Sequence, residues 1–365
     1  MAGNILFITS AMCKGGAETQ LVKLALFLKL LNFNILIISL KPINEFTIDY
    51  EKAGIPVVFL KSWRFNLVTN SRKLYELTRE FKPDVVIAFM FISIIFARLL
   101  KKVLPFKLIS TIRIGVIPGK WFVPFKLTSG LDDLVVYNSQ ASKLNFESKK
   151  IVKSPGIVIK NAIQLPKLGD KFLKSFPNGK FIWICIAHFR WNKDYTTLFK
   201  AISKLKGRNF RVDIIGEYDK QSNPGRLIEQ LEIQDHVNLL GFKQNAADYL
   251  KYADAFVLSS HSEGMPNALL EAMAYSKPVV VTNIPCNAEV LQNSGCGLLS
   301  KLENEQDLAE QMLIMMKMTP EERSCLGKKG RLYIQNNCSE DDIMKDWLRV
   351  VNQYIPVRQQ VMETV

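Results

Sequence analysis

Two glutamates flank a short segment whose composition suits an anion-binding site. Glu263 lies in a loop with Gly264 and Pro266, and Glu271 lies about one turn into a helix that can begin at Asn267. Backbone N–H groups at a helix start have no partner within the helix and bind anions such as phosphate. The two carboxylates could then bind hydroxyl groups on either side of a bound phosphate. On spacing alone the alternative is a solvated loop glutamate and an exposed helix glutamate, because such pairs are common.

The sequence around this loop predicts the elements that position it. An apolar strand ends near Ser259, and in a parallel α/β sheet the loop after a strand lies at the edge where ligands bind. Similar apolar strands are expected at residues 4–9, 35–40, 84–89, 181–187, 210–215, 237–240, 255–259 and 278–282. Helices are expected at 17–31, 71–81, 195–205, 246–252, 267–275 and 305–316. Continuous apolar strands separated by helices indicate parallel sheets covered on both faces. The pattern occurs twice, which predicts two doubly wound α/β domains.

The boundary between these domains is expected in the Pro-, Gly- and Lys-rich region near 162–178. We expect an N-terminal domain at 1–167, a second domain at 168–338 and a C-terminal helix and tail at 339–365. Ser339 and Asp342 resemble a capping box, and apolar residues at 343, 347, 350, 351 and 354 form one helical stripe. Such a stripe must pack on a domain, and we expect it to return to the first one.

Charge divides the chain into two unlike halves. The 365 residues carry a formal charge of +14, and residues 1–178 alone hold 26 Lys and Arg against 11 Asp and Glu. This asymmetry predicts an anionic partner for the first half: a membrane surface, a phosphorylated lipid or a nucleic acid. The apolar content of 48% and charged content of 22% are ordinary for a globular protein, which excludes wholesale disorder, collagen and coiled coil.

Cations and aromatic residues alternate between Arg98 and Lys126. The segment contains Lys101, Lys102, Phe106, Lys107, Arg113, Lys120, Trp121, Phe122 and Phe125. Such a surface suits an anionic membrane interface or a polyprenyl diphosphate head group. The alternative is a solvated basic face with Trp121 and Phe122 buried. Nucleic acid is disfavoured, because the segment has no signature of an RRM, KH or helix-turn-helix domain.

The expected cellular compartment follows from three patterns that the sequence lacks. Six cysteines occur without a C-x-x-C pair, and there are three histidines, so we expect a reducing compartment and no structural zinc. Residues 1–10 have no signal-peptide pattern, and the apolar run from Val85 to Ala97 is too short to span a membrane. We therefore expect a cytoplasmic protein bound peripherally to the inner face of the cell membrane.

Residue order in the loop and helix is more specific than spacing. The run E-G-M-P-N-A-L-L-E-A-M-A from Glu263, followed by K-P-V-V-V-T from Lys277 and by Glu289, resembles the signature of retaining glycosyltransferases of family 4. Further matching segments are Gly15–Glu18, Tyr137–Ser139, Lys160–Ala162 and Ile186–Asp194, so the resemblance covers nearly the whole chain. It implies two Rossmann-like domains facing across a cleft in the GT-B arrangement, with the C-terminal helix packing back on the first domain.

The resemblance also implies roles for individual residues. It implies that Glu271 binds the ribose of a nucleotide sugar, that Glu263 contacts the donor sugar, and that Lys193 neutralises the diphosphate. His188 occupies the place of the family's usual arginine, and Arg190 could supply that charge from a shifted position. We therefore predict Glu263, Lys193 and Arg190 as catalytic residues. The predicted donor site further contains Gly15, Gly16, Arg113, His188, Gly264, Met265, Pro266, Asn267, Leu269 and Glu271.

Several residues depart from the family pattern. Ser276 and Cys286 replace glycines, and we expect Cys286 to be a small loop residue rather than a nucleophile because no cation is near it in sequence. The family's GT-B class does not need a metal-binding D-x-D, and we expect Asp132–Asp133 to be a surface turn. The predicted site therefore holds no metal and needs no cofactor.

These inferences predict a retaining glycosyltransferase. It would move a hexose or N-acetylhexosamine from a nucleotide sugar, expected to be UDP-linked, to a lipid-linked glycan for a bacterial surface polysaccharide such as O-antigen. Enzyme alternatives are a sugar-nucleotide epimerase and a transferase to a soluble acceptor on the same fold. The non-enzyme alternative is a basic lectin-like or nucleic-acid-binding scaffold.

Overall fold

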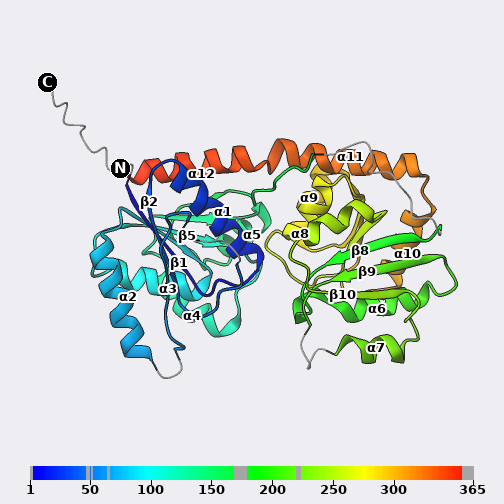
Figure 1. Ribbon diagram of the computed structural model, residues 1–365, viewed down its shortest axis with the longest axis horizontal. Coiled ribbons are helices and arrows are strands. Elements are labelled where there is room, and N and C mark those ends of the chain that lie inside the picture. The colour runs from blue at the N-terminus through cyan, green and yellow to red at the C-terminus, as the bar shows by residue number, and fades with distance from the viewer. Residues whose placement is uncertain are drawn as a thin grey trace. The chain divides into compact units, whose positions relative to one another are not determined.

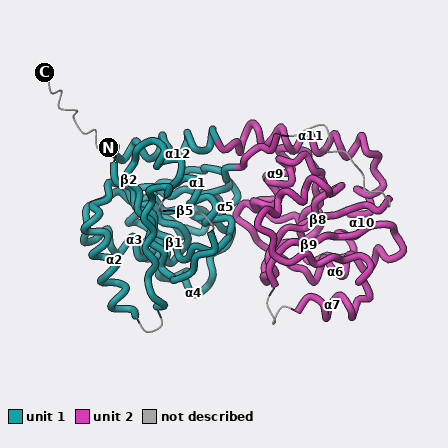
Figure 2. The backbone as a smooth tube through the Cα atoms, in the orientation of Figure 1, with its two compact units in different colours: residues 1–162, 341–365 teal, residues 163–340 magenta. Residues whose placement is uncertain are grey.

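The computed structural model describes residues 3–46, 50, 52–63, 66–167, 179–218 and 223–355. Contacts within the chain divide it into two compact units, residues 1–162 with 341–365 and residues 163–340 (Figure 2). The first stretch of unit 1 ends at Ala162, a few residues before the boundary expected at 167. That expected boundary borders residues outside the described ranges. A parallel β-bridge between Ile163 and Ser339 holds together the two points where the chain enters and leaves the second unit.

The first unit is built on a parallel sheet of seven strands in the order β3-β2-β1-β4-β5-β6-β7 (Figure 1). The strands are β1 (Asn4–Thr9), β2 (Asn34–Ser39), β3 (Val57–Phe59), β4 (Val85–Phe89), β5 (Lys107–Ile112), β6 (Leu134–Tyr137) and β7 (Gly156–Val158). The helices are α1 (Gly16–Leu30), α2 (Leu67–Phe81), α3 (Phe91–Lys101), α4 (Gly119–Thr128), α5 (Gln140–Ser148) and α12 (Glu340–Tyr354). The strand order reverses between β1 and β4.

Both faces of this sheet are buried, as its uninterrupted apolar strands predict. Ile5 and Phe7 of β1 pack with α1 and α12, whereas Leu6 and Ile8 face the other way and pack with α2, α3, α4 and α5. The alternation arises because successive side chains of a strand point to opposite faces. The stripe of α12, including the buried Trp347, lies in the core of the first unit, so the prediction for the C-terminal helix is confirmed.

The second unit is built on a parallel sheet of six strands in the order β10-β9-β8-β11-β12-β13. The strands are β8 (Phe181–Ile186), β9 (Phe210–Ile215), β10 (Val237–Gly241), β11 (Ala255–Leu258), β12 (Val279–Thr282) and β13 (Gly297–Ser300). The helices are α6 (Tyr195–Lys204), α7 (Pro224–Gln230), α8 (Asn267–Ala274), α9 (Pro285–Ser294), α10 (Glu305–Lys317) and α11 (Pro320–Asn337), with 3₁₀ helices η1 (Trp191–Lys193) and η2 (Ala246–Tyr252). This strand order is that of Rossmann domains, so the predicted α/β fold with two doubly wound domains is confirmed.

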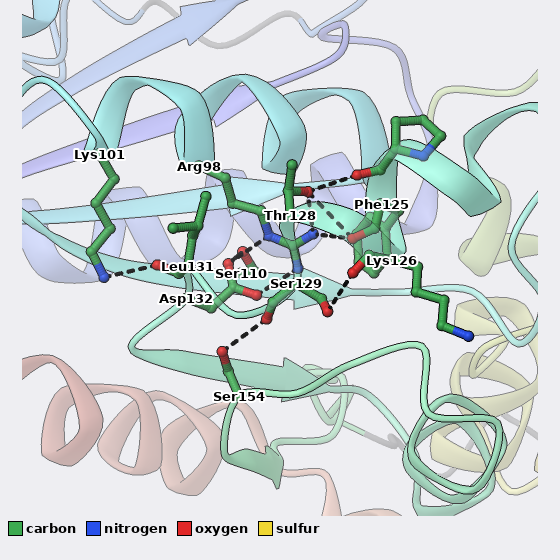
Figure 3. A network of polar contacts seen from close by, with 11 residues as sticks. Arg98, Lys101, Ser110, Phe125, Lys126, Thr128, Ser129, Leu131, Asp132 and Ser154 are labelled. Atoms are coloured by element: carbon green, nitrogen blue, oxygen red, sulfur yellow. Dashed lines mark hydrogen bonds and ion pairs between the residues drawn. The ribbon is translucent and has the colours of Figure 1, made fainter.

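A buried ion pair fixes α3 and α4 to the sheet of the first unit (Figure 3). Both side chains of the Arg98–Asp132 pair are fully buried, and the contact is bidentate, with Nε to Oδ1 at 2.8 Å and Nη2 to Oδ2 at 2.5 Å. Arg98 also donates to the carbonyl of Phe125 at 2.8 Å, and the Ser110 hydroxyl donates to Asp132 at 2.7 Å. Asp133 binds Lys101, Lys107 and the Leu108 N–H. The expectation of a surface turn at Asp132–Asp133 is therefore wrong.

Candidate functional site

The loops after β8 and β11 meet at the carboxyl edge of the second sheet, because these two strands are neighbours. The strand order reverses between them, and in open α/β sheets ligands bind at such a switch point. The loop after β8 leads into η1 and carries Lys193, and the loop after β11 leads into α8 and carries Glu263. The fold thus brings together two segments that lie 70 residues apart in sequence.

Lys193 and Glu263 form an ion pair at the centre of this edge. Lys193 Nζ donates to Glu263 Oε1, and the Ser260 hydroxyl donates to the same oxygen at 2.8 Å. The side chains are 19% and 13% exposed, so the pair is partly withdrawn from solvent yet open to a ligand. The structure therefore brings two of the three predicted catalytic residues into direct contact.

A network of side chain to backbone hydrogen bonds fixes the turn that presents Lys193. The Ser259 hydroxyl lies 3.0 Å from the Lys193 carbonyl and 2.9 Å from the Asp194 carbonyl. Asp194 adopts a left-handed conformation with φ of 47° and caps α6 by accepting the Thr197 N–H at 3.1 Å. The Asn192 amide donates to the carbonyl of Ser262 at 3.1 Å. Sequence reasoning did not find the roles of Ser259 and Asn192, because their partners lie 65 to 70 residues away along the chain.

His188 is held beside the start of the loop after β9. The Glu217 N–H donates to His188 Nδ1 at 3.1 Å, which requires that nitrogen to be unprotonated and leaves the ring proton on Nε2. Gly216 makes the close approach possible, because a Cβ there would lie 1.9 Å from the Ala187 carbonyl oxygen. Arg190 is exposed at the start of η1.

The predicted residues around α8 divide into side chains in the core and groups at the edge. Met265 and Leu269 belong to the hydrophobic core of the second unit, so they can meet a ligand at this edge through their backbone N–H groups. Gly264 and Pro266 are also buried, with Pro266 directly before the helix. The polar residues Asn267 and Glu271, at the first and fifth positions of α8, are half-buried.

Three further predicted residues lie in the first unit. Gly15 and Gly16 form the start of α1, at the carboxyl end of β1. Arg113 follows β5 and is 9% exposed, with Nη1 donating to Asn161 at 2.8 Å and the guanidinium 5.7 Å from the Trp347 ring. Burial lowers the pKa of Arg113 to about 10. Its contacts therefore hold it in the core against the C-terminal helix, and its predicted role at the donor remains a prediction.

Ser276 and Cys286, which replace glycines of the family pattern, lie in different kinds of local structure. Ser276 has φ of 56°, the left-handed conformation that glycine adopts most readily. Cys286 lies in the first turn of α9 rather than in a loop, so that expectation is wrong. Burial raises the pKa of its thiol, which keeps the sulfur protonated and poorly nucleophilic.

Comparison with known proteins identifies the second unit. Residues 170–333 match the family model described as Glycosyl transferases group 1. The matched residues all lie within the second unit. The predicted family resemblance is thereby confirmed, and the domain contains Lys193, Glu263 and Glu271.

Relatives of the group 1 domain extend into the first unit. An uncharacterised glycosyltransferase of Methanocaldococcus jannaschii is 27% identical over 260 residues, which are 64% of this chain and 63% of that protein. The N,N'-diacetylbacillosaminyl-diphospho-undecaprenol alpha-1,3-N-acetylgalactosaminyltransferase of Campylobacter jejuni is 26% identical over 219 residues, 59% of this chain and 55% of that protein. The chain thus spans less than two thirds of the length of each of these relatives.

A solved structure extends the likeness in fold to almost the whole chain. Anabaena HepE in complex with UDP and glucose has a TM-score of 0.82 and 17% sequence identity, and the match covers 96% of this chain and 99% of that one. Both units therefore take part in the shared fold.

Proposed function

We propose that this protein is a retaining glycosyltransferase that moves a hexose or N-acetylhexosamine from a UDP sugar to a lipid-linked glycan of a bacterial surface polysaccharide, such as O-antigen. The Lys193–Glu263 pair beside the start of α8, at the switch point of the group 1 domain, is the observation that carries the proposal. A cation and helix N–H groups suit a diphosphate, and a carboxylate suits sugar hydroxyls. The Campylobacter relative supports the acceptor class, because its name specifies a diphospho-undecaprenol substrate.

In the proposed reaction the bond between the anomeric carbon and the diphosphate oxygen breaks as the acceptor oxygen attacks from the same face. The departing diphosphate takes the acceptor proton, so no protein nucleophile is needed. Lys193 and the N–H groups at the start of α8 stabilise the charge that develops on the leaving group. Glu263 orients the donor sugar, Glu271 binds the ribose, and Arg190 adds positive charge at the mouth of the site. The proposal requires neither a metal nor a cofactor.

The proposed membrane contact lies on α3 and α4 and differs from the surface expected from sequence. Arg98 is buried, Lys101 and Lys107 bind Asp133, and Phe125 lies in the core. The outward positions on α3, on the turn that follows it and on α4 are instead apolar residues and exposed lysines, of which Lys120 lies over the Trp121 ring at 5.7 Å. These are Leu99, Val103, Val123 and Leu127, at 49%, 64%, 61% and 78% exposure, with the exposed Lys102 and Lys120.

This α3–α4 surface suits the edge of an anionic bilayer. Apolar side chains can enter the interface while lysines bind anionic head groups, each contributing about 1 kcal/mol. No described helix has both the length and the apolar composition needed to cross a membrane. We therefore propose peripheral attachment at the inner face of the cell membrane, with the lipid-linked acceptor delivered from that surface. Trp121 and Phe122 are half-buried, so they would contribute less to membrane binding than the sequence suggested.

Release of nucleoside diphosphate from a panel of sugar nucleotides, with and without a polyprenyl-diphosphate-linked acceptor, tests the proposed function. We expect acceptor-dependent release of UDP from one or a few UDP sugars, with the anomeric configuration retained in the product. Interconversion of the sugar nucleotide without release would favour the epimerase. If no donor releases nucleoside diphosphate, with or without the acceptor, and the protein binds carbohydrate or nucleic acid, the non-enzyme alternative would be favoured.

A further inference from the structure

A cavity of about 410 Å³, here called the amino-edge cavity, lies where the strands of the second sheet begin. Its walls come from the start of β8, the turn before β9, the last turn of α10 and the first turn of α11. Strand β8 has six residues, and each advances the chain by about 3.3 Å, so the cavity lies about 20 Å from the loop after β8. That loop carries Lys193. The amino-edge cavity is therefore separate from the candidate donor site.

Positive charge dominates the amino-edge cavity. Its described lining residues include one carboxylate, Asp254, and four cations, which are Lys180, Arg208, Lys317 and Arg323. Residues 163–340 as a whole are nearly neutral, with 22 Lys and Arg against 20 Asp and Glu. The excess of cations at this cavity is therefore local and does not follow from the composition of the second unit.

The carboxylates near the cavity are engaged elsewhere. Asp254 Oδ2 accepts the backbone N–H of Ile182 at 2.8 Å, which joins the start of β11 to β8. Glu232 binds Lys206, two residues before Arg208, at 3.0 Å. Within the described ranges, none of the four cavity cations forms an ion pair. Cations gathered without counterions repel one another, and an anion placed among them reduces that repulsion.

Arg323 is held in place, whereas the other three cations are free to adjust. Arg323 is half-buried, its Nη1 donates to the carbonyl of Met318, and its Cζ lies 5.1 Å from the centre of the Phe181 ring. A guanidinium has five N–H donors, so these contacts leave donors for a ligand. The remaining cations are exposed around it. The cavity thus combines one positioned cation with three that can move to meet an anion.

Apolar side chains line the same cavity. Phe181, Leu313 and Met316 are half-buried and pack against the core of the second unit. An inorganic ion would leave this surface in contact with water, whereas a ligand with an apolar part would cover it. The volume also falls within the range of small-molecule sites, which is about 300 to 1,000 Å³.

We propose that the amino-edge cavity binds a phosphate ester whose organic part is apolar or aromatic. Arg323 donates to the phosphate oxygens, the three exposed cations add charge around them, and the organic part lies against Phe181 and Met316. A phosphate monoester carries about 1.5 to 2 negative charges at neutral pH, which suits four cations better than a single carboxylate does. The inference goes beyond the proposed function, because it uses none of the residues assigned to the donor.

Methionine methyl groups report on the two edges of the sheet separately. Met316 lines the amino-edge cavity, and Met265 lies beside the start of α8 at the opposite edge. Phenyl phosphate is titrated into protein with isotope-labelled methionine methyl groups and followed by NMR. Phenol serves as the ligand without a phosphate, and inorganic phosphate as the ligand without an apolar part. We expect phenyl phosphate to saturate the shift of the Met316 signal at a lower concentration than either of the other two.

Several outcomes of this titration would overturn the proposal. An unmoved Met316 signal would reject the site. Equal responses to phenyl phosphate and phenol would reject the role of the cations, and equal responses to phenyl phosphate and inorganic phosphate would reject that of the apolar residues. A shift at Met265 with none at Met316 would place the phosphate at the donor edge, which would support the proposed function and reject this inference.

Two double variants test whether the position of the charges matters. Arg208→Gln with Lys317→Gln removes two charges from the cavity, and Lys200→Gln with Arg226→Gln removes two from positions on α6 and α7 outside its lining. All four side chains are exposed, so both variants should keep the fold. We expect the affinity for phenyl phosphate, read at Met316, to fall about tenfold in the cavity variant and less than about twofold in the control. Equal losses would show that the response follows net charge alone and would overturn the site.

Sedimentation with vesicles that contain phosphatidic acid distinguishes a lipid from a soluble ester. Selective loss of vesicle binding in the cavity variant, with the control variant unchanged, would support the site and identify a lipid head group as the source of its phosphate. Equal vesicle binding by the two variants, together with the selective loss of phenyl phosphate affinity, would support a soluble ester.

Discussion

Replacing Glu263 by glutamine should have opposite effects on binding and on turnover. In the structure Lys193 is already bound to Glu263, so a diphosphate must share that cation or displace the carboxylate. Glutamine keeps the size of the side chain and an oxygen acceptor for Ser260 but removes the negative charge. Lys193 is then released to the phosphate, and we expect UDP to bind more tightly to Glu263→Gln. Turnover should fall, because the carboxylate no longer holds the donor sugar.

The size of the gain follows from the burial of the pair. A hydrogen bond to a charged group contributes about 1.5 to 3 kcal/mol. The side chains of Lys193 and Glu263 are still 19% and 13% exposed, so solvent screening places their contribution at or below the low end of this range. We therefore expect a gain of about 1 kcal/mol, or about fivefold in UDP affinity. Loss of the sugar contact from the transition state should lower turnover by about ten- to a hundredfold.

Calorimetry with UDP and a transfer assay measure the two effects on the same preparation. Glu271→Gln is the matched control, because it makes the same chemical change eight residues later on α8. We expect that variant to weaken UDP binding, since Glu271 is assigned to the ribose. Weaker UDP binding in Glu263→Gln would refute the reasoning, because it would mean that the carboxylate itself helps to hold the nucleotide. Unchanged turnover would remove Glu263 from the sugar site.

Four other changes test separate parts of the proposal. Lys193→Ala should lose more affinity for UDP than for uridine in calorimetry, and equal losses would remove Lys193 from the phosphate site; the same comparison on Arg190→Ala and His188→Ala decides which supplies the remaining contact. EDTA should leave steady-state activity largely intact, whereas loss of activity that Mg²⁺ or Mn²⁺ restores would contradict the metal-free mechanism. Asp132→Ala should lower the free energy of unfolding in urea by about 3 to 5 kcal/mol, because it leaves the buried Arg98 without its partner, and a change below about 1 kcal/mol would refute that account. Sedimentation with anionic vesicles should show binding that weakens in high salt and in a variant with Lys102 and Lys120 changed to Ser, and equal binding to neutral vesicles would reject the α3–α4 surface.

Local sequence pattern was sufficient for most strands that are uninterrupted apolar runs. Strands such as β1, β4 and β8 are uninterrupted apolar runs, and their period and flanking helices leave few alternatives. The expected strands did not include β5, a buried strand of six residues that contains the polar residues Ser110 and Thr111. They also did not include β3, β7 or β13, which have three or four residues each and are mostly half-buried. Such short strands are specified by the neighbours they pair with rather than by their own side chains.

Pairs of charged residues are the part of the structure that local pattern did not reveal. Arg98 was expected on a membrane surface and Asp132 in a surface turn, yet they bind each other in the core across 34 residues of sequence. A lysine in an exposed turn and a lysine bound to a carboxylate look alike in a sequence, since the partner is chosen by the fold. The same limit explains why the family resemblance identified Lys193 and Glu263 as site residues but did not reveal their contact.

Under the proposed function, the pairing of Lys193 with Glu263 distinguishes a UDP sugar from the UDP that remains after transfer. When a diphosphate takes Lys193, the Glu263 carboxylate loses its cation and needs a new partner. A bound sugar supplies hydroxyl groups to it, whereas UDP alone leaves it beside a phosphate of the same sign. The exchange of partners should therefore favour the intact donor and speed release of the product. If so, the ratio of donor affinity to UDP affinity should fall in Glu263→Gln, through looser donor binding as well as tighter UDP binding. A ratio equal to that of wild type would show that the two residues act independently.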